Sequence, residues 1–438
     1  MPENTPPPQP SLGEALRFWL RFGCISFGGP AGQIAMMHRF LVDKKRWISN
    51  DKFLHALNYC MLLPGPEAQQ LATYMGWLLH GTRGGLAAGI LFVLPSAFIL
   101  WALSAAYVTW GSLPMIQAVF EGLKPAVLAI IIGAVIKISK KSCITPLHWI
   151  VAVLAFVSIY FLRMPFPVII LGAIAVGIAH YFATKNNATS TKTAQKATDN
   201  ERSYLINQYS ETKGGGFSAA RIAKQIAVAA IVWVLPLIVC YCLGGDIFYE
   251  KLALFFTQAA FVTFGGAYAV LPYVAQVSVA KFGWLTHNQM LDGLALGETT
   301  PGPLIMVLAF VGFMAGYNTF DGSLWAATLG LILTTYYTFI PSFLFIFVGA
   351  PIIERTHANP AVKAVLQFAT AAITGVILSL CLYFGQAVIA PTPPNILFWP
   401  LFWVLISLAA LQRFGIGLLT WIAVSAAVGV LKYLIFGG

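Results

Sequence analysis

The sequence predicts an all-α polytopic membrane protein made of two repeats of inverted topology, with broken or re-entrant helices and one extra linking transmembrane helix. Three observations lead to this prediction. Hydrophobic residues fill 58% of the 438 positions and charged residues only 9%, which is not the composition of a soluble domain. Short motifs recur in register along the chain. Glycine and proline interrupt segments that are otherwise apolar enough to cross a bilayer.

Apolar segments that reach or approach spanning length, roughly 20 residues, occur along the whole chain. They occupy residues 86–107, 126–138, 149–162, 168–182, 226–243, 324–348, 365–382, 397–411 and 416–436. Residues 1–12 lack the basic start and apolar centre of a signal peptide, so we expect a disordered tail there.

Charge and cysteine usage exclude several classes of function. The net charge of +11 does not indicate a nucleic-acid partner, because Lys and Arg gather in the connecting segments, as orientation signals do. The six cysteines form no CxxC pair and lie mostly in apolar segments, where a free cysteine acts as a small hydrophobic residue. No Ser/His/Asp set, phosphate-binding loop or zinc spacing is present. We therefore predict no metal, no cofactor and no enzymatic activity, and a lipid bilayer as the surroundings.

Three motifs occur twice with the same spacing. Phe27-Gly28-Gly29 recurs as Phe264-Gly265-Gly266, Trp47 as Trp284, and Pro64-Gly65-Pro66 as Pro301-Gly302-Pro303, so each pair is 237 positions apart. Pro95-Ser96 matches Pro341-Ser342 after a further shift of nine residues. Such self-similarity indicates a duplicated chain.

The duplication divides the chain into five parts. We predict the tail at residues 1–12, a first transmembrane repeat at 13–183, a polar cytoplasmic linker at 184–220, a linking transmembrane helix at 221–244 and a second repeat at 245–438. The linker is rich in polar residues and is not expected to bury a core. The linking helix has no counterpart in the first half, so it inverts the second repeat, as in many secondary transporters.

Basic residues test the inversion. Five of them lie between the two broken stretches of the first half, namely Arg39, Lys44, Lys45, Arg46 and Lys52, whereas the second copy has only Lys281 there. The positive-inside rule places the basic segment and the linker in the cytoplasm. This favours re-entrant hairpins and nine full crossings, and thirteen crossings is the alternative. Both versions place the N-terminus in the cytoplasm and the C-terminus outside.

The broken segments predict an anion site. Gly and Pro break the helical hydrogen-bond ladder, and at membrane depth the freed groups must face protein or a water-filled cavity. A helix that restarts there points backbone N–H groups and a positive dipole end into the cavity. The predicted substrate-binding residues are Gly28, Gly29, Pro30, Ala31, Gln33, Pro64, Gly65, Pro66, Gln69, Gly265, Gly266, Thr299, Thr300, Pro301, Gly302 and Pro303.

These motifs and their order resemble the chromate ion transporter family in its long, two-domain form. The resemblance rests on the FGG, Trp, PGP and PS motifs of both halves and covers nearly the whole chain except the tail and the linker. It implies an inner-membrane transporter that exports chromate, driven by the electrochemical gradient, and hence chromate resistance. Ala267 stands where the first copy has Pro30, so the two halves are not expected to contribute equally.

Ionisable residues at membrane depth are functional candidates because they are costly to bury. Glu298 precedes the second PGP at a helix end, where the dipole and burial favour its neutral form, and it is the preferred proton carrier. Glu67 follows the first PGP and is the second candidate. Glu121 and Lys124 are three residues apart, and we expect them to pair on one helix face.

The sequence thus predicts a secondary active transporter that exports chromate, or a similar divalent oxyanion, by alternating access coupled to protons. The alternatives are a transporter of sulfate or another oxyanion by uptake or exchange, and an anion channel. The oligomeric state stays open, with a homodimer as the candidate assembly.

Overall fold

The computed structural model describes residues 6–184, 203–207, 210, 219–242, 247–264, 266–353, 360–391 and 397–436. In these residues the chain is helical, apart from loops and one isolated bridge between Ile48 and Ile206. The first half contains α1 (Leu12–Ile25), α2 (Gly29–His38), the π-helical η1 (Arg39–Lys44), α3 (Asn50–Cys60), α4 (Glu67–Trp110), α5 (Pro114–Ser142), α6 (Pro146–Tyr160) and α7 (Phe166–Thr184). The linking helix is α8 (Ala219–Cys242). The second half contains α9 (Ile247–Val262), α10 (Ala267–Ala275), η4 (Gln276–Lys281), α11 (His287–Thr299), η5 (Leu304–Met306), α12 (Val307–Thr319), α13 (Leu324–Ile353), α14 (Pro360–Ile389), α15 (Phe398–Leu408), η6 (Ala409–Arg413) and α16 (Leu418–Phe436).

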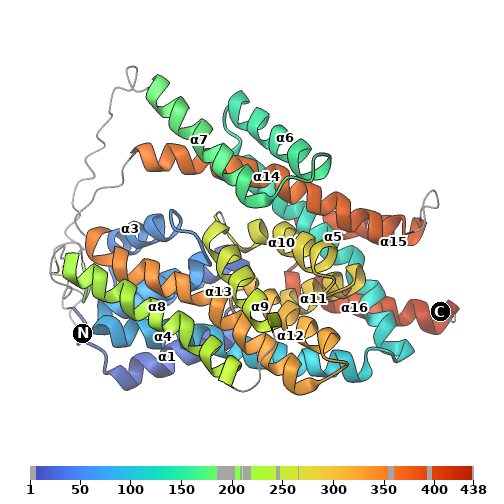
Figure 1. Ribbon diagram of the computed structural model, residues 1–438, viewed down its shortest axis with the longest axis horizontal. Helices are drawn as coiled ribbons and strands as arrows, with labels where there is room; N and C mark the ends of the chain where they lie inside the picture. Colours follow the sequence, from blue (N-terminus) through green and yellow to red (C-terminus); the bar gives the residue numbers. More distant parts are fainter. Residues whose placement is uncertain are drawn as a thin grey trace.

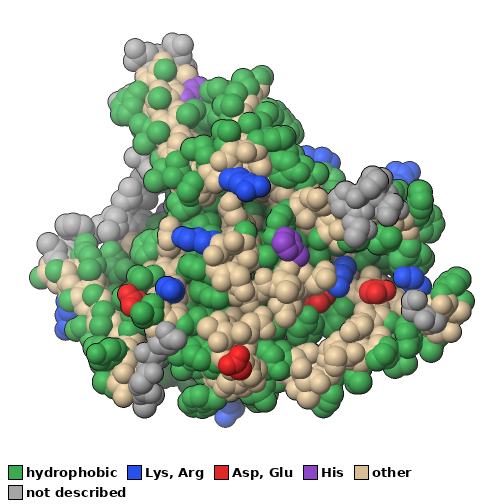
Figure 2. All heavy atoms as spheres, turned by 45° about the vertical axis from the view of Figure 1, so that its right-hand side comes forward, with side chains coloured by type: hydrophobic (Ala, Val, Ile, Leu, Met, Phe, Trp, Pro, Cys, Tyr) green, Lys and Arg blue, Asp and Glu red, His purple; other side chains and the backbone are tan. Residues whose placement is uncertain are grey.

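The predicted all-α polytopic membrane fold is confirmed. Among the described residues, seven helices are long and apolar enough to cross a membrane: α4, α5, α7, α8, α13, α14 and α16. Two further predicted segments, 149–162 and 397–411, fall in α6 and α15, which are shorter apolar helices. Figure 2 shows a face on which hydrophobic side chains dominate and charged ones are few, which suits a surface in contact with lipid.

The order of helices in the first half recurs in the second. The π-helical segments begin at Arg39 and Gln276, which are 237 positions apart like the sequence motifs. In both copies a short helix precedes this segment and another short helix follows the loop after it. The repeated sequence pattern therefore corresponds to a repeated set of elements.

The first short helices of each half return to the face from which they start. Lys45, after η1, forms an ion pair with Glu14 near the start of α1 at 3.0 Å. In the second half, the ring of Phe248 at the start of α9 lies 5.6 Å from the ring of Trp284, which follows η4. These contacts bring the two ends of each segment together, as in a hairpin. Its orientation in the membrane stays a prediction.

The long helix α4 is also a hairpin. His80 and Gly81 have non-helical backbone angles, and the chain reverses there into a short arm, 67–79, and a long arm, 82–110. Gly76 and Gly84 lie against each other across the arms, since only residues without a Cβ allow such a close approach. Helices α12 and α13 form the corresponding pair in the second half.

The last helices of each half pack against a long helix of the other half. Helices α6 and α7 of the first half pack against α14 of the second, and α15 and α16 pack against α5 of the first. Figure 1 shows α6 and α7 beside α14. The crossings use small residues, such as Gly122 against Gly429 and Gly375 against Ala152. Close packing of this kind holds helices together where lipid provides no hydrophobic drive.

Part of the predicted linker, which was not expected to bury a core of its own, packs against the rest of the protein. Residues 203–207 lie along the loop after η1: Ser49 N donates to Ile206 O at 2.8 Å, and Ile206 N donates to Trp47 O at 3.0 Å. Tyr204 and Leu205 pack on the apolar cluster of the first half. The physical reason is the apolar triplet at 204–206, which the overall polarity of the segment concealed.

Candidate functional site

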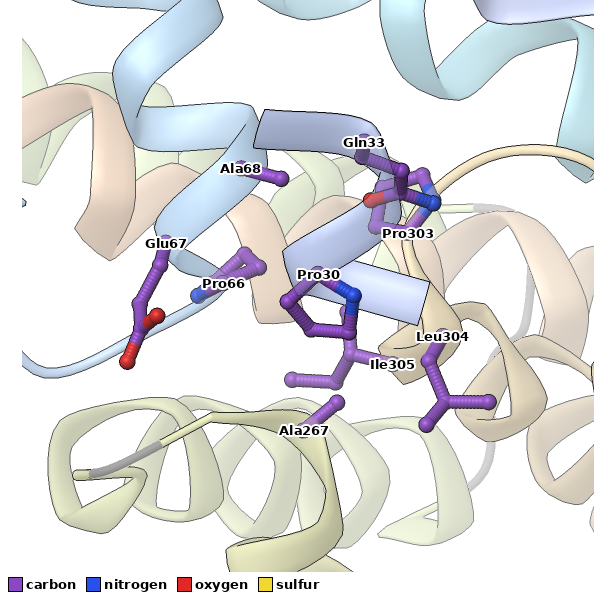
Figure 3. A pocket seen from close by; sticks show the side chains of 9 residues that line it. All are labelled: Pro30, Gln33, Pro66, Glu67, Ala68, Ala267, Pro303, Leu304 and Ile305. Carbon is purple, nitrogen blue, oxygen red and sulfur yellow. The ribbon is translucent and has the colours of Figure 1, made fainter. Parts of the chain in front are cut away.

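The starts of four helices meet at one small cavity. Its lining consists of Pro30 and Gln33 from α2, Pro66, Glu67 and Ala68 from the start of α4, Ala267 from α10, and Pro303, Leu304 and Ile305 at the start of η5. Figure 3 shows these side chains around the common space. Two of the four helix starts come from each half, and each follows one of the breaks predicted from the sequence.

Glycine is required in the breaks because the backbone enters the left-handed region. The φ angle is +94° at Gly28, +68° at Gly29, +118° at Gly65, +99° at Gly266 and +96° at Gly302. Residues with a Cβ are strained at such angles. The predicted site residue Gly265 lies outside the described residues.

Each PGP turn is hydrogen-bonded to the other half. Gly65 N donates to Thr263 O at 2.7 Å, and Gly302 N donates to Ser26 O at 2.8 Å. Ser26 and Thr263 are 237 positions apart, as are Gly65 and Gly302, so the two bonds are equivalents. The breaks of the two halves are therefore interlocked rather than merely adjacent.

The serines of the PS motif pack on the same turns. A Cβ at Gly65 would lie 2.6 Å from Ser342 Oγ, and a Cβ at Gly302 would lie 2.8 Å from Ser96 Cβ. Each serine belongs to the half opposite its glycine. The hydroxyls of Ser96 and Ser342 are buried and have no hydrogen-bond partner among the described residues.

Gln33 is the polar side chain most closely tied to the breaks. It is only 1% exposed, and its Nε2 donates to Ser26 O at 3.3 Å and to Gly302 O. These two carbonyls fix the orientation of the amide, because its oxygen cannot face them. Its Oε1 has no hydrogen-bond partner among the described residues. The side chain thus joins two breaks from different halves and keeps one free acceptor.

The structure brings some predicted site residues to the cavity and leaves others out. Pro30, Gln33, Pro66, Glu67 and Pro303 line it. The other described candidates do not line it: Gly28, Gly29, Ala31, Pro64, Gly65, Gln69, Gly266, Glu298, Thr299, Thr300, Pro301 and Gly302. Thr299 and Thr300 donate their hydroxyls to Leu296 O at 2.7 and 2.6 Å, so they cap the end of α11. Gln69 Nε2 donates to Thr73 Oγ1 within α4.

The two candidate acids have different surroundings. The carboxylate of Glu67 lies on the side of Pro66, away from Gln33 and Pro303 (Figure 3). Glu298 is 7% exposed and accepts a hydrogen bond from Tyr268 Oη at 2.7 Å. Because Tyr268 directly follows Ala267, this bond connects Glu298 to the break at Gly266. Sequence reasoning missed Tyr268, although its position just after the FGG motif was a signal.

A partly buried ion pair was also missed. Glu121 and Lys124 were expected to pair with each other, and this is wrong. Lys124 Nζ lies 3.6 Å from Asp292 Oδ1, and Glu121 lies 3.5 Å from Lys432. The three-residue spacing along α5 does not decide the pairing, because Asp292 on α11 and Lys432 on α16 lie within ion-pair distance of these two side chains. Asp292, an acid in an apolar neighbourhood, was the available signal.

The cavity is small in this structure. Its volume is about 10 Å³, roughly the space of one water molecule, and a tetrahedral oxyanion needs more. Among the described residues, no group of three His, Cys, Asp or Glu is placed to hold a metal ion. The arrangement can therefore concentrate positive helix ends on one point, and it must widen before a ligand enters.

Comparison with known proteins places the chain in a family. The family described as chromate transporter matches residues 13–178 and 250–430, one segment in each predicted repeat. The chain is 30% identical to a probable chromate transport protein of Synechococcus elongatus over 388 residues, 86% of each chain. It is 29% identical to a chromate transport protein of Pseudomonas aeruginosa over 386 residues, 86% of this chain and 81% of that protein.

A shorter relative matches as well. The uncharacterized transporter YwrB of Bacillus subtilis is 26% identical over 181 residues, which are 40% of this chain and 91% of that protein. No solved structure matches the chain. The two family segments together span most of the sequence and include all four helix breaks that meet at the cavity, and so the chain belongs to the chromate transporter family.

Proposed function

We propose that the protein is a secondary active transporter that exports chromate across the inner membrane by alternating access. The observation that carries the proposal is the meeting of four helix starts, two from each half, at one cavity. The names of the Synechococcus and Pseudomonas relatives support chromate as the substrate. The anion passes through chemically unchanged, so no enzymatic step is assigned.

The chemistry of the breaks suits an oxyanion. Each helix start carries roughly half a positive charge at its end, and backbone N–H groups there bind anionic oxygens without a cationic side chain. The helix starts after Gly28-Gly29-Pro30, Pro64-Gly65-Pro66, Gly266 and Pro301-Gly302-Pro303 are assigned to substrate binding. Chromate and sulfate are both tetrahedral dianions, so sulfate is the second candidate substrate.

The small cavity and the interlocked turns support alternating access. The bonds from Gly65 N to Thr263 O and from Gly302 N to Ser26 O connect one half to the other. Separating the halves on one side breaks one equivalent bond while the other stays formed. A rocking motion between two such states opens the site to each side in turn. An anion channel, by contrast, needs a continuous pore.

Proton coupling is assigned to Glu298. Its carboxyl accepts a hydrogen bond from Tyr268, one residue from the cavity wall at Ala267. A change in the protonation of Glu298 is therefore transmitted to the break at Gly266. Glu67 is the second candidate because it lines the cavity itself. The N-terminus is assigned to the cytoplasm and the C-terminus to the outside, from the distribution of Lys and Arg.

The proposal is tested with inverted membrane vesicles that contain the protein. Chromate and sulfate uptake are measured in parallel, with and without an imposed proton gradient. We expect saturable chromate uptake that the gradient accelerates. Uptake equal to that of vesicles without the protein would refute transport, and a non-saturating current would favour the channel.

A further inference from the structure

A second charged site joins the two halves away from the cavity. Asp292 lies on α11 of the second half, and its partners, Tyr107 on α4 and Lys124 on α5, both belong to the first half. Tyr107 Oη donates to Asp292 Oδ2 at 2.9 Å. Lys124 Nζ lies 3.6 Å from Asp292 Oδ1, which is beyond hydrogen-bond distance.

The surroundings of this site are apolar. Asp292 is 5% exposed, and the ring of Tyr107 packs edge-on against Phe120 and Phe310, with ring centroids 5.3 and 5.5 Å away. Asp292 Oδ1 is buried and has no hydrogen-bond partner among the described residues. One carboxylate oxygen is thus held by Tyr107, and the other faces only the ammonium group of Lys124, without direct contact.

The site has no counterpart in the other copy. The equivalent of Asp292 at a distance of 237 positions is His55. Helices α5 and α14 start at Pro114 and Pro360, an offset of 246 positions (360 − 114), and this second offset relates Lys124 to Thr370. The charged pair is therefore specific to one copy.

Several other titratable groups near α11 make contacts away from Asp292. Glu121 on α5 pairs with Lys432 on α16. Tyr383 on α14 stacks against His287 at the start of α11. Further along α11, Glu298 binds Tyr268. Other titratable groups on packed elements include Tyr317 on α12, which lies beside Gly322, and Cys381 on α14. Among the described residues, Asp292 forms its ion pair with Lys124 and its hydrogen bond with Tyr107.

We propose that Lys124 and Asp292 form a second oxyanion site in which a proton on Asp292 frees Lys124 to bind the anion. The inference rests on the proposed function, because the anion is the transported oxyanion. With Asp292 ionised, its charge neutralises Lys124. When Oδ1 takes a proton, Tyr107 still holds Oδ2, and the ammonium group is left without a counter-ion in apolar surroundings. An oxyanion oxygen then replaces the carboxylate.

The proton and the anion consequently bind together. One proton is taken up by the carboxylate of Asp292 for each anion that binds to Lys124, and no bond of the anion changes. Lys124 is a binding residue in this scheme, and Tyr107 is a positioning residue because it acts through Asp292. Glu298 carries a different proton, the one that drives transport.

The test measures chromate binding to the purified full chain in lipid nanodiscs at several pH values. In the wild type, affinity is expected to fall as the pH rises. Asp292→Asn should bind at every pH with a flat profile, because Lys124 has no competing charge. Lys124→Met should lose about tenfold or more in affinity at every pH. Glu121→Gln is the matched control, since its partner is Lys432, and should keep the wild-type profile.

Proton uptake gives an independent readout that does not depend on the stability of a variant. An indicator dye in weakly buffered solution should report proton uptake when chromate is added to the wild type, beyond the signal of the same addition without protein. The absence of uptake, or an Asp292→Asn profile that follows the wild type, overturns the inference and leaves the proposed function standing. If the wild type binds no chromate at any pH, both fail. If the variants fold poorly, Lys124→Arg and Asp292→Glu preserve the charges and should preserve the pH profile.

Discussion

Replacing Gly302 by alanine tests whether the breaks of the two halves are interlocked as described. Gly302 has a φ of +96°, and a Cβ there would lie 2.8 Å from Ser96 Cβ of the first half. Its amide donates to Ser26 O at 2.8 Å. The substitution therefore strains the backbone, crowds a contact between the halves and displaces a hydrogen bond between them.

The cost follows from these three effects. A left-handed backbone costs a non-glycine residue about 1–2 kcal/mol, and an extra methyl group in a packed contact costs about 1–3 kcal/mol. A displaced hydrogen bond adds about 1 kcal/mol. We expect the free energy of unfolding to fall by about 3–6 kcal/mol. Gly283→Ala is the matched control, because Gly283 has a φ of +63° and no atom within 4 Å of the added Cβ; it should lose only about 1–2 kcal/mol.

The assay is denaturant unfolding of the purified protein in detergent, followed by tryptophan fluorescence. Combining Gly302→Ala with Ser96→Gly removes the crowding but not the strain, and should recover about 1–3 kcal/mol. If Gly302→Ala is no worse than Gly283→Ala, or if Ser96→Gly gives no recovery, the proposed contact between the halves is wrong.

Three further predictions concern topology, coupling and the site. A cysteine placed at Asp51, in a variant whose six native cysteines are replaced, should react only with reagents that reach the cytoplasmic side; purely external labelling would eliminate the hairpin. Glu298→Gln should abolish the acceleration of transport by an imposed proton gradient while chromate binding is kept, whereas Glu67→Gln should retain the acceleration; an unchanged response of the first variant would remove Glu298 from the coupling step. Gln33→Leu leaves the two buried carbonyls that its amide binds without this donor, so stability should fall by about 1–3 kcal/mol and chromate affinity should weaken; an unfolding curve like that of the wild type would contradict this role of the side chain.

Several features of the site could be predicted from the sequence because they depend on local chemistry. The PGP and FGG motifs break helices wherever they occur, and their spacing of 237 positions located four helix starts before any packing was known. Three proline members of these motifs, Pro30, Pro66 and Pro303, do line the cavity. Thr299 and Thr300 were predicted as uncharged donors to an oxyanion, and in this structure their hydroxyls donate to a carbonyl of their own helix instead.

The sequence by itself determined the helical class, the membrane environment, the duplicated order of elements and the positions of the breaks. These follow from hydrophobicity and from backbone strain at glycine and proline, which act within a few residues. The tertiary structure decided which groups meet: Tyr268 with Glu298, Lys124 with Asp292, and each PGP turn with a carbonyl of the opposite half. Such pairings join residues up to 276 positions apart, as for Gly302 and Ser26. They depend on how helices from two halves pack, which no local pattern specifies.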